Sequence, residues 1–230
     1  RSTLFPYTTL FRSVKFPEID QEIDNTFKSL VDAENLIVDS RLAWYFIPNS
    51  FKVFLKTNIV VSAQRISGDK ERINENYTSI QEAAMKIVER KKSEVKRYKL
   101  YYGVDCLDYT NYDLIIDTTE VPPKDVCEII LSEFEKFGIM KKNYTPQAFV
   151  SPRNLYPTLA TDQSNDITVT NVDSFDYILS GHAKVAAATK EKLPLVRVNY
   201  VSDRQTGNFH DKELIAKWQQ DNDFKYLIEP

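Results

Sequence analysis

Three residues in the middle of the chain have types and spacing suited to binding phosphate groups. Arg90, Glu94 and Arg97 lie in the segment ERKKSEVKRY at spacings of four and three residues. A helix has about 3.6 residues per turn, so this spacing puts all three side chains on one face, with the carboxylate between two guanidiniums. Arginine offers a planar fork of N–H donors that matches phosphate oxygens. A solvated helix face held by charge pairs is the plainer explanation of the same spacing.

The charge around these residues also favours an anionic ligand. Residues 86–99 contain seven basic and two acidic residues. The whole chain has 30 Lys and Arg against 33 Asp and Glu, a net charge of −3, so the positive charge is local. The preceding segment SGDKERINENYT is polar and contains Gly68, which predicts a surface loop. A basic helix joined to such a loop could close over phosphate groups.

A second stretch, DYILSGHAKVAAATKEKLPLVRV, has the order strand, tight turn, Ala-rich helix and strand. Gly181 at the turn lets backbone N–H groups face outward where the helix begins, which favours an anion there. Lys184 in the first turn opposes the helix dipole but would pair with a bound phosphate. An exposed turn histidine at His182, followed by a plain packing helix, explains the same residues. Both interpretations stay open.

The composition is typical of a soluble globular protein and disfavours several other classes. Apolar residues make up 42% and charged residues 27% of the chain, as in soluble globular proteins. No apolar run approaches the roughly 18–20 residues of a membrane span, and the net charge of −3 disfavours a surface that coats nucleic acid. Cys106 and Cys127 are too few for a zinc site, so we predict no metal centre and reduced thiols in a reducing cytoplasm. The oligomeric state stays open.

The elements that would position these residues follow from the apolar patterns. Short apolar runs bounded by turn residues predict buried parallel strands at 36–39, 51–55 and 113–119. Periodic apolar spacing predicts helices over 17–31, 58–66, 79–99 and 122–137. Ser79 is the expected N-cap of the long helix, and Gly138 is expected just past the end of the last one. Strands that alternate with helices indicate an α/β fold with a mostly parallel sheet.

The segment KKNYTP interrupts this alternation and predicts a domain boundary. We expect a first domain at 14–139, a linker at 140–145 and a second domain at 146–230. The second domain has strand patterns near 167–170, 176–180 and 195–201, and helix patterns from 182 and over 211–222. These patterns predict a smaller α+β unit.

Five motifs of the first domain occur in a fixed order: LIVDSRLAW, KVFL, SAQRIS, ERKKSEVKRYKLYYGVD and NYDLIIDTT. Together they resemble the cytidylate kinase family, especially its archaeal-type branch, over residues 19–137. The resemblance implies a P-loop-kinase-like parallel sheet and an enzyme that transfers a phosphoryl group from ATP to CMP or dCMP with Mg²⁺. Which monophosphate is the acceptor stays open.

The resemblance also implies roles for individual residues. Arg90 and Arg97 match the arginines that hold the acceptor and transferred phosphates, and are the expected catalytic residues. Glu94 matches the acid that orients the sugar or an arginine. Asp39 and Arg41 match positions close to the bound monophosphate.

Three further positions bear on the donor nucleotide or depart from the family pattern. Arg65 matches the lid arginine that faces ATP. Ser40 takes the place of a glycine, and Lys91 takes the place of an acidic residue after the first arginine. The lid, with Gly68 and Asp69, lacks a second basic residue.

A larger departure is that the 230 residues contain no G-x-x-x-x-G-K-[ST] motif, whose backbone N–H groups and lysine hold the donor phosphates. The stretch TLFPYTTLFRS, residues 3–13, resembles the translation of a short-read sequencing adapter, so residues 1–13 are predicted to be an artefact. We therefore expect an N-terminally truncated kinase that is inactive in this form. A non-catalytic nucleotide-binding regulator is the alternative.

The second domain resembles the ParB and sulfiredoxin-like superfamily over residues 149–201. Its phosphate-binding box is a Gly followed by His or Glu and basic residues, and then an Ala-rich helix. Gly181, His182 and Lys184 match that box, and Arg153 in VSPRNLYPT is their expected partner. Ala183 departs from the pattern, because many members have a polar or basic residue there. The resemblance implies a nucleotide or phosphate ligand for this domain.

Overall fold

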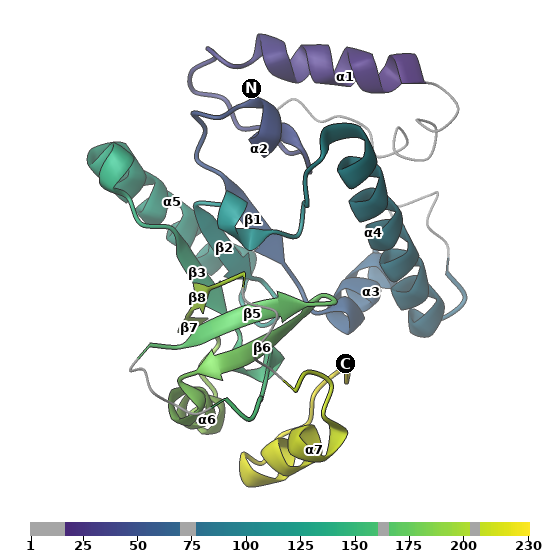
Figure 1. Cartoon of the computed structure of the whole chain (residues 1–230), viewed down its shortest axis with the longest axis vertical. Helices are drawn as coiled ribbons and strands as arrows, with labels where there is room; N and C mark the ends of the chain where they lie inside the picture. The colour runs from purple at the N-terminus through teal and green to yellow at the C-terminus, as the bar shows by residue number, and fades with distance from the viewer. Residues whose placement is uncertain (1–16, 70–76, 161–165, 203–207) are drawn as a thin grey trace. The chain divides into compact units, whose positions relative to one another are not determined.

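A computed structural model describes residues 17–69, 77–160, 166–202 and 208–230 (Figure 1). The adapter-like segment 3–13 and most of the loop predicted at 67–78 lie outside the described residues. The chain forms two compact units, residues 1–52 and residues 53–230.

The described part of the first unit contains two helices, α1 (Pro17–Ser29) and α2 (Ala43–Phe46). Phe27 and Phe46 stack with their ring centres 5.9 Å apart, and Phe27 is only 3% exposed. The predicted helix at 17–31 is therefore confirmed in its position, and Phe27 on its apolar face packs as the spacing requires.

The predicted strand at 36–39 is wrong. In the structure this segment contains only a single bridge residue, Val38, and no strand. Ile37 is 82% exposed, and no strand of the described residues pairs along the segment. A buried parallel strand needs neighbours to satisfy its backbone groups, so the apolar run alone does not produce one.

The second unit is built on two four-stranded sheets. The first sheet has the order β1-β2-β3-β7, and the second has the order β4-β6-β5-β8. The strands of the first sheet are β1 (Val53–Lys56), β2 (Leu114–Asp117), β3 (Gln147–Val150) and β7 (Val196–Arg197). β1, β2 and β3 are parallel and β7 is antiparallel to β3, which confirms the mostly parallel sheet. All four residues of β2 are buried, as expected for a central parallel strand.

Three helices of this unit match the predicted ones closely. They are α3 (Ile59–Gly68), α4 (Ile80–Tyr102) and α5 (Pro123–Met140), and Figure 1 shows α3 and α4 side by side. Ser79 caps α4 by accepting a hydrogen bond from the backbone N–H of Glu82, as predicted. Gly138 does not end α5, because the helix continues to Met140 and is followed by Lys141, which has a positive φ of 48°.

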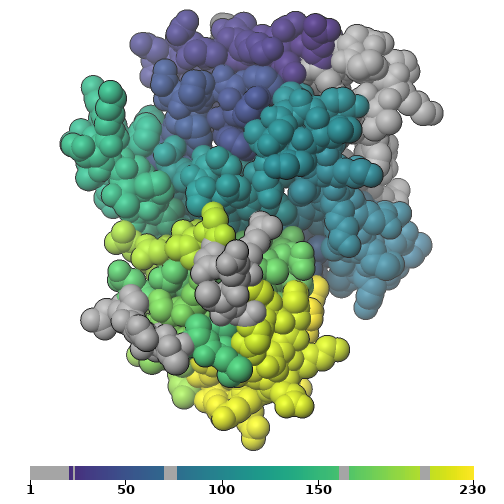
Figure 2. Space-filling model, viewed as in Figure 1, coloured from purple at the N-terminus to yellow at the C-terminus, as the bar shows by residue number. Residues whose placement is uncertain are grey.

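The second sheet and its helices complete the unit. Its strands are β4 (Leu155–Tyr156), β5 (Thr168–Val172), β6 (Phe175–Ser180) and β8 (Asn199–Tyr200). Helix α6 (His182–Lys190) follows β6, and α7 (Lys212–Asp221) lies near the C-terminus. Buried Tyr156, Tyr177, Ile215 and Tyr226 form one apolar cluster. In Figure 2 the yellow C-terminal surface accordingly lies against the green surface of residues around β6.

The structure differs from the expected division at 140–145. A short 3-10 helix (Lys141–Asn143) leads from α5 into β3, and β3 pairs with β2 of the first predicted domain. Residues on both sides of the segment therefore share one sheet and one compact unit. The segment does not separate two units, because backbone pairing crosses it. The assignment of 146–230 to its own superfamily stays a prediction.

The single strand predicted at 195–201 is divided between the two sheets. β7 pairs with β3, whereas β8 pairs with β5. Val198 lies between them and is 3% exposed, and its N–H donates to the carbonyl of Ala148. The two sheets are thus joined through one continuous stretch of chain.

No helix within the described ranges is long and apolar enough to cross a membrane.

Candidate functional site

The arginine face predicted on the long helix is present on α4. Arg90, Glu94 and Arg97 are all half-buried, whereas Lys92 and Lys96, which lie between them in sequence, are exposed. The guanidinium carbon of Arg97 lies 5.2 Å from the centre of the Tyr98 ring. The spacing of four and three residues therefore places these side chains on the inward-turned side of the helix.

The carboxyl ends of the parallel strands form a second polar region. Lys56 ends β1 and is in register with Asp117, which ends β2. In open α/β sheets ligands bind at this edge of the sheet. The segment that follows β3 also reaches this edge, because the N–H of Ser151 donates to Asp117.

Arg65 is directed to this edge rather than away from the protein. Its Nη2 donates to the carbonyl of Thr118 at 2.8 Å and to that of Thr119 at 3.4 Å, although the residue stays exposed. The contact ties α3 to the end of β2. A guanidinium held in this way sits at the sheet edge and keeps part of its surface accessible.

Asp117 is the centre of a saturated hydrogen-bond network. Its Oδ1 accepts from the N–H and hydroxyl of Thr119, and its Oδ2 accepts from the side-chain amide of Asn154 at 2.7 Å. The residue is 0% exposed. Both oxygens are therefore engaged, which does not fit a carboxylate that binds Mg²⁺ directly. The described residues contain no cluster of His, Cys, Asp or Glu able to hold a metal ion.

A buried ion pair lies next to the edge. Lys56 Nζ pairs with Asp176 of β6, whose side chain is 1% exposed. Tyr200 donates to Asp176 Oδ2 at 2.8 Å, and Asn171 donates to Oδ1 at 2.7 Å. Burial by itself lowers the pKa of Lys56, but Asp176, Tyr109 and Asp117 together outweigh burial and hold that pKa above its ordinary value.

Lys91 of α4 lies close enough to this ion pair for the charges of Lys56 and Asp176 to shift the pKa of Lys91. Burial lowers the pKa of Lys91, and the positive charge of Lys56 lowers it further, while Asp176 acts in the opposite direction. The position that departs from the family pattern is thus a half-buried lysine on the helix that carries the arginines.

Asp39 and Arg41 lie in the first unit. Asp39 is exposed and Arg41 is half-buried. The hydroxyl of Ser40 accepts from the N–H of Leu42 at 3.2 Å, and the carbonyl of Arg41 accepts from the Trp44 indole at 3.1 Å. These contacts order the backbone that leads into α2.

The predicted strand, glycine turn and helix around residue 181 are confirmed. Gly181 has a φ of 83°, and a Cβ there would come within 2.8 Å of the Ile167 backbone, so only glycine fits without a shift. His182 Nε2 accepts from the N–H of Thr158 at 3.3 Å, which commits the ring to a structural contact. Lys184 is exposed.

Arg153 is engaged at the sheet edge. Its guanidinium forms a two-pronged ion pair with Glu120, which follows β2, and Ser151 donates to the same carboxylate at 3.0 Å. Both Arg153 and the N-terminus of α6 belong to the region after β3, since α6 packs on the short helix Pro152–Asn154.

Sequence reasoning missed several polar residues of this region. Lys56 and Asp117 each close an apolar strand, and that position was the available signal, because the ends of parallel strands meet at one edge. Asp176 and Asn154 gave no such signal. Their partners are 120 and 37 residues distant in sequence, so only the folded chain identifies them.

The region that carries these features can be compared with known proteins. Residues 17–120 match the cytidylate kinase-like family. This cytidylate kinase-like region includes α3, α4 with its arginine face, and β2. It ends at Glu120, the partner of Arg153.

The individual relatives are likewise similar to only part of this chain. A cytidylate kinase of Methanosarcina acetivorans is 38% identical over 108 residues, which are 45% of this chain and 57% of the relative. A cytidylate kinase of Pyrococcus abyssi is 38% identical over 115 residues, 50% of this chain and 60% of the relative. The chain thus spans less than two thirds of these relatives' length.

A larger protein of a different name is also similar to part of this chain. An S-adenosylmethionine-dependent nucleotide dehydratase of Lacinutrix mariniflava is 34% identical over 128 residues, 55% of this chain and 25% of that protein. About half of this chain is therefore similar to proteins named cytidylate kinase and to a quarter of a longer protein.

Proposed function

We propose that the chain is part of a nucleoside monophosphate kinase, a phosphotransferase that moves a phosphoryl group from ATP to CMP or dCMP. One observation carries the proposal: the region similar to cytidylate kinases includes a helix whose Arg90, Glu94 and Arg97 are turned inward together. Phosphoryl transfer depends on positioning and charge stabilisation, which arginines on a rigid helix supply.

In this proposal Arg90 and Arg97 contact the acceptor and transferred phosphates. Glu94 lies between them and orients the acceptor sugar or one of the guanidiniums. Arg65, held at the end of β2, faces the phosphates of ATP. Asp39 and Arg41 of the first unit contribute to the monophosphate site.

The cosubstrate in this proposal is ATP, and Mg²⁺ arrives with the ATP phosphates. Asp117 is fully engaged by protein donors, so it does not serve as a direct ligand of the ion. Mg²⁺ characteristically binds through substrate phosphates and keeps several waters, which fits this arrangement. The 230 residues contain no G-x-x-x-x-G-K-[ST] loop, so we expect little phosphoryl transfer by them alone.

The proposal is tested first by binding of CMP to the 230-residue chain, measured by titration calorimetry. We expect Arg90→Ala to weaken binding by about 10-fold or more, because a charge-assisted hydrogen bond is lost. Lys96→Ala is the matched control, since Lys96 is an exposed cation of the same helix, and its effect should stay below about fivefold. Equal effects of the two changes would contradict a phosphate role for Arg90.

Turnover is tested in the protein translated from the complete reading frame, obtained by long-read sequencing upstream of Val14. In that protein Arg90→Ala should lower kcat with CMP by about 100-fold or more. CMP binding without turnover would favour the alternative, a non-catalytic nucleotide-binding regulator. An upstream reading frame that does not encode the phosphate-binding loop would also favour the non-catalytic regulator.

For the second half we propose a phosphate or nucleotide site at the N-terminus of α6. The support is the left-handed Gly181 and its close approach to Ile167, which shape the turn. Lys184→Ala is the better test, because Lys184 is exposed, whereas His182→Ala would leave the Thr158 N–H without its acceptor. We expect Lys184→Ala to weaken binding of inorganic phosphate by about fivefold or more. An unchanged affinity would favour a plain packing helix.

A further inference from the structure

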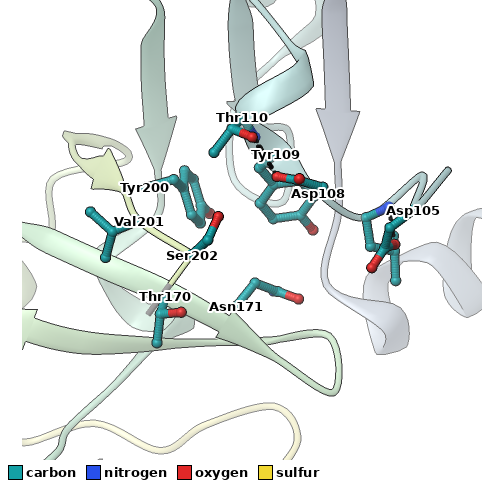
Figure 3. Close-up of a pocket in the computed structure, with 10 residues that line it drawn as sticks. Asp105, Asp108, Tyr109, Thr110, Thr170, Asn171, Tyr200, Val201 and Ser202 are labelled. Carbon is teal, nitrogen blue, oxygen red and sulfur yellow. Dashed lines mark hydrogen bonds between the residues drawn. The ribbon is translucent and has the colours of Figure 1, made fainter. Parts of the chain in front are cut away.

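A cavity of about 240 Å³ opens between the segment that follows α4 and the second sheet. Its walls include Asp105 and Tyr109 on one side and Asn171 and Tyr200 on the other, as Figure 3 shows. Sites for drug-sized ligands measure roughly 300–1,000 Å³. The cavity therefore suits a smaller molecule or one end of a larger one.

Among the described residues, the charge of the walls disfavours a phosphate ligand. The 10 lining residues include two carboxylates, Asp105 and Asp108, and no Lys, Arg or His. Lys56 lies nearby, with Nζ 5.5 Å from the centre of the Tyr109 ring, but its charge is paired with Asp176. The electrostatics thus favour a neutral or positively charged ligand.

Tyr109 provides a polar group that the protein itself does not use. The residue is 5% exposed, and none of the hydrogen bonds between described residues involves its hydroxyl. Figure 3 shows that hydroxyl facing the cavity. Burial raises the pKa of Tyr109 to about 12, so the hydroxyl stays protonated and neutral at pH 7. The hydroxyl is open to the cavity rather than sealed in the interior, so a ligand with a polar group can exchange a hydrogen bond with it.

Two more oxygen acceptors are held in place around the cavity. The side-chain N–H of Asn171 is committed to Asp176, which leaves its carbonyl oxygen directed to the cavity. Asp105 Oδ1 accepts from the N–H of Leu107 at 2.9 Å, which fixes the carboxylate. The two tyrosine rings meet edge to face, with centres 4.8 Å apart.

We propose that this cavity binds a primary ammonium group. An ammonium has three N–H donors and no acceptor, and the cavity offers oxygens from Asp105, Tyr109 and Asn171. Lys56 Nζ already lies over both tyrosine rings, 5.5 and 5.9 Å from their centres, so the ligand is held by these oxygens and not by the ring faces. This site is separate from the arginine face and does not depend on the proposed kinase function.

The probe is n-butylamine, which is an ammonium ion at pH 7, titrated into the 230-residue chain by calorimetry. It is compared with 1-butanol, which lacks the charge, and with tetramethylammonium, which has the charge but no N–H. We expect butylammonium to bind at least about 10-fold more tightly than either, since each loses charge-assisted hydrogen bonds. Equal binding of the three, or none, would overturn the proposal, as would displacement of butylammonium by CMP.

A substitution in the cavity wall tests whether butylammonium binds in this cavity. Tyr109→Phe keeps the ring and removes the hydroxyl, so butylammonium should bind about 10-fold more weakly. Tyr156→Phe is the matched control, because Tyr156 is 3% exposed and its hydroxyl donates to the Ile228 carbonyl, away from the cavity. Both variants are compared by thermal unfolding to establish that they fold. If the two variants bind butylammonium equally well, the proposed site is wrong.

Discussion

Asp176 receives donors from three segments that are far apart in sequence. Lys56 comes from β1, Asn171 from β5 and Tyr200 from β8. A carboxylate that is 1% exposed cannot be solvated by water, so its charge depends on these partners. Removing one partner of a buried pair is costly because the other charge remains buried.

We therefore predict that Lys56→Met lowers the free energy of unfolding by about 3–5 kcal/mol. The double variant Lys56→Met with Asp176→Leu should recover part of this loss, since it leaves no buried charge. Urea denaturation followed by tryptophan fluorescence measures both. Lys124→Met is the control, because its pair with Glu128 is exposed, and it should cost less than about 1 kcal/mol. A loss for Lys56→Met as small as that of the control would contradict a buried pair.

At the scale of elements, the helices begin and end where single residues satisfy the backbone. Ser79 caps α4, and Gly103 ends it in the left-handed conformation with a φ of 70°. Glu82 also accepts from the N–H and hydroxyl of Thr78, which holds the first turn. α6 begins at Gly181, whose positive φ turns the chain from β6 into the helix.

Replacing a glycine by alanine should have opposite effects on stability at the turn before α6 and in the interior of α5. Gly181→Ala should lower the free energy of unfolding by about 2 kcal/mol or more, since the left-handed conformation alone costs roughly 1–2 kcal/mol for other residues. The added Cβ would also meet the Ile167 backbone at 2.8 Å.

Gly138→Ala is the matched control within α5. A Cβ there meets nothing within 4 Å, so the change should stabilise the chain by about 0.5–1 kcal/mol through helix propensity. Thermal or urea denaturation of the two variants gives the comparison. Effects of the same sign would contradict the structure of the turn.

At the scale of the whole molecule, buried tyrosines couple stability to alkaline pH. Burial raises the pKa of Tyr109 and of Tyr177 to about 12. In the unfolded chain these hydroxyls ionise near about pH 10. Between those values the folded state binds more protons than the unfolded state, so stability falls as pH rises. Lys91 has a lowered pKa and acts in the opposite direction, but its contribution ends near the ordinary lysine value of about 10.4.

We predict that the free energy of unfolding decreases as the pH rises from about 9 to about 11. Tyr109→Phe and Tyr177→Phe should each reduce that decrease, because each removes one group with a raised pKa. Urea denaturation at a series of pH values measures the slope. A free energy that stays constant or rises over this range would contradict the burial of the tyrosine hydroxyls.

The candidate site was partly predictable because its main feature is local. Arg90, Glu94 and Arg97 lie on one helix, so their spacing was sufficient to bring them to one face. The sequence could not predict that three other polar residues, Lys56, Asp117 and Asp176, lie close together. Their proximity depends on strand order and on which residues the sheets bury. The roles of the three α4 residues in binding stay predictions.

By itself the sequence determined the elements whose signals are short-range: the N-terminal ends of α4 and α6 and the buried run of β2. The alternation of strands and helices along the chain also predicted that β1 and β2 are parallel. Only the tertiary structure decided that residues 36–39 form no strand and that 195–201 divides between two sheets. It also decided that pairing crosses the segment 140–145. The physical reason is that a helix satisfies its own backbone, whereas a strand exists only where another segment supplies its hydrogen bonds.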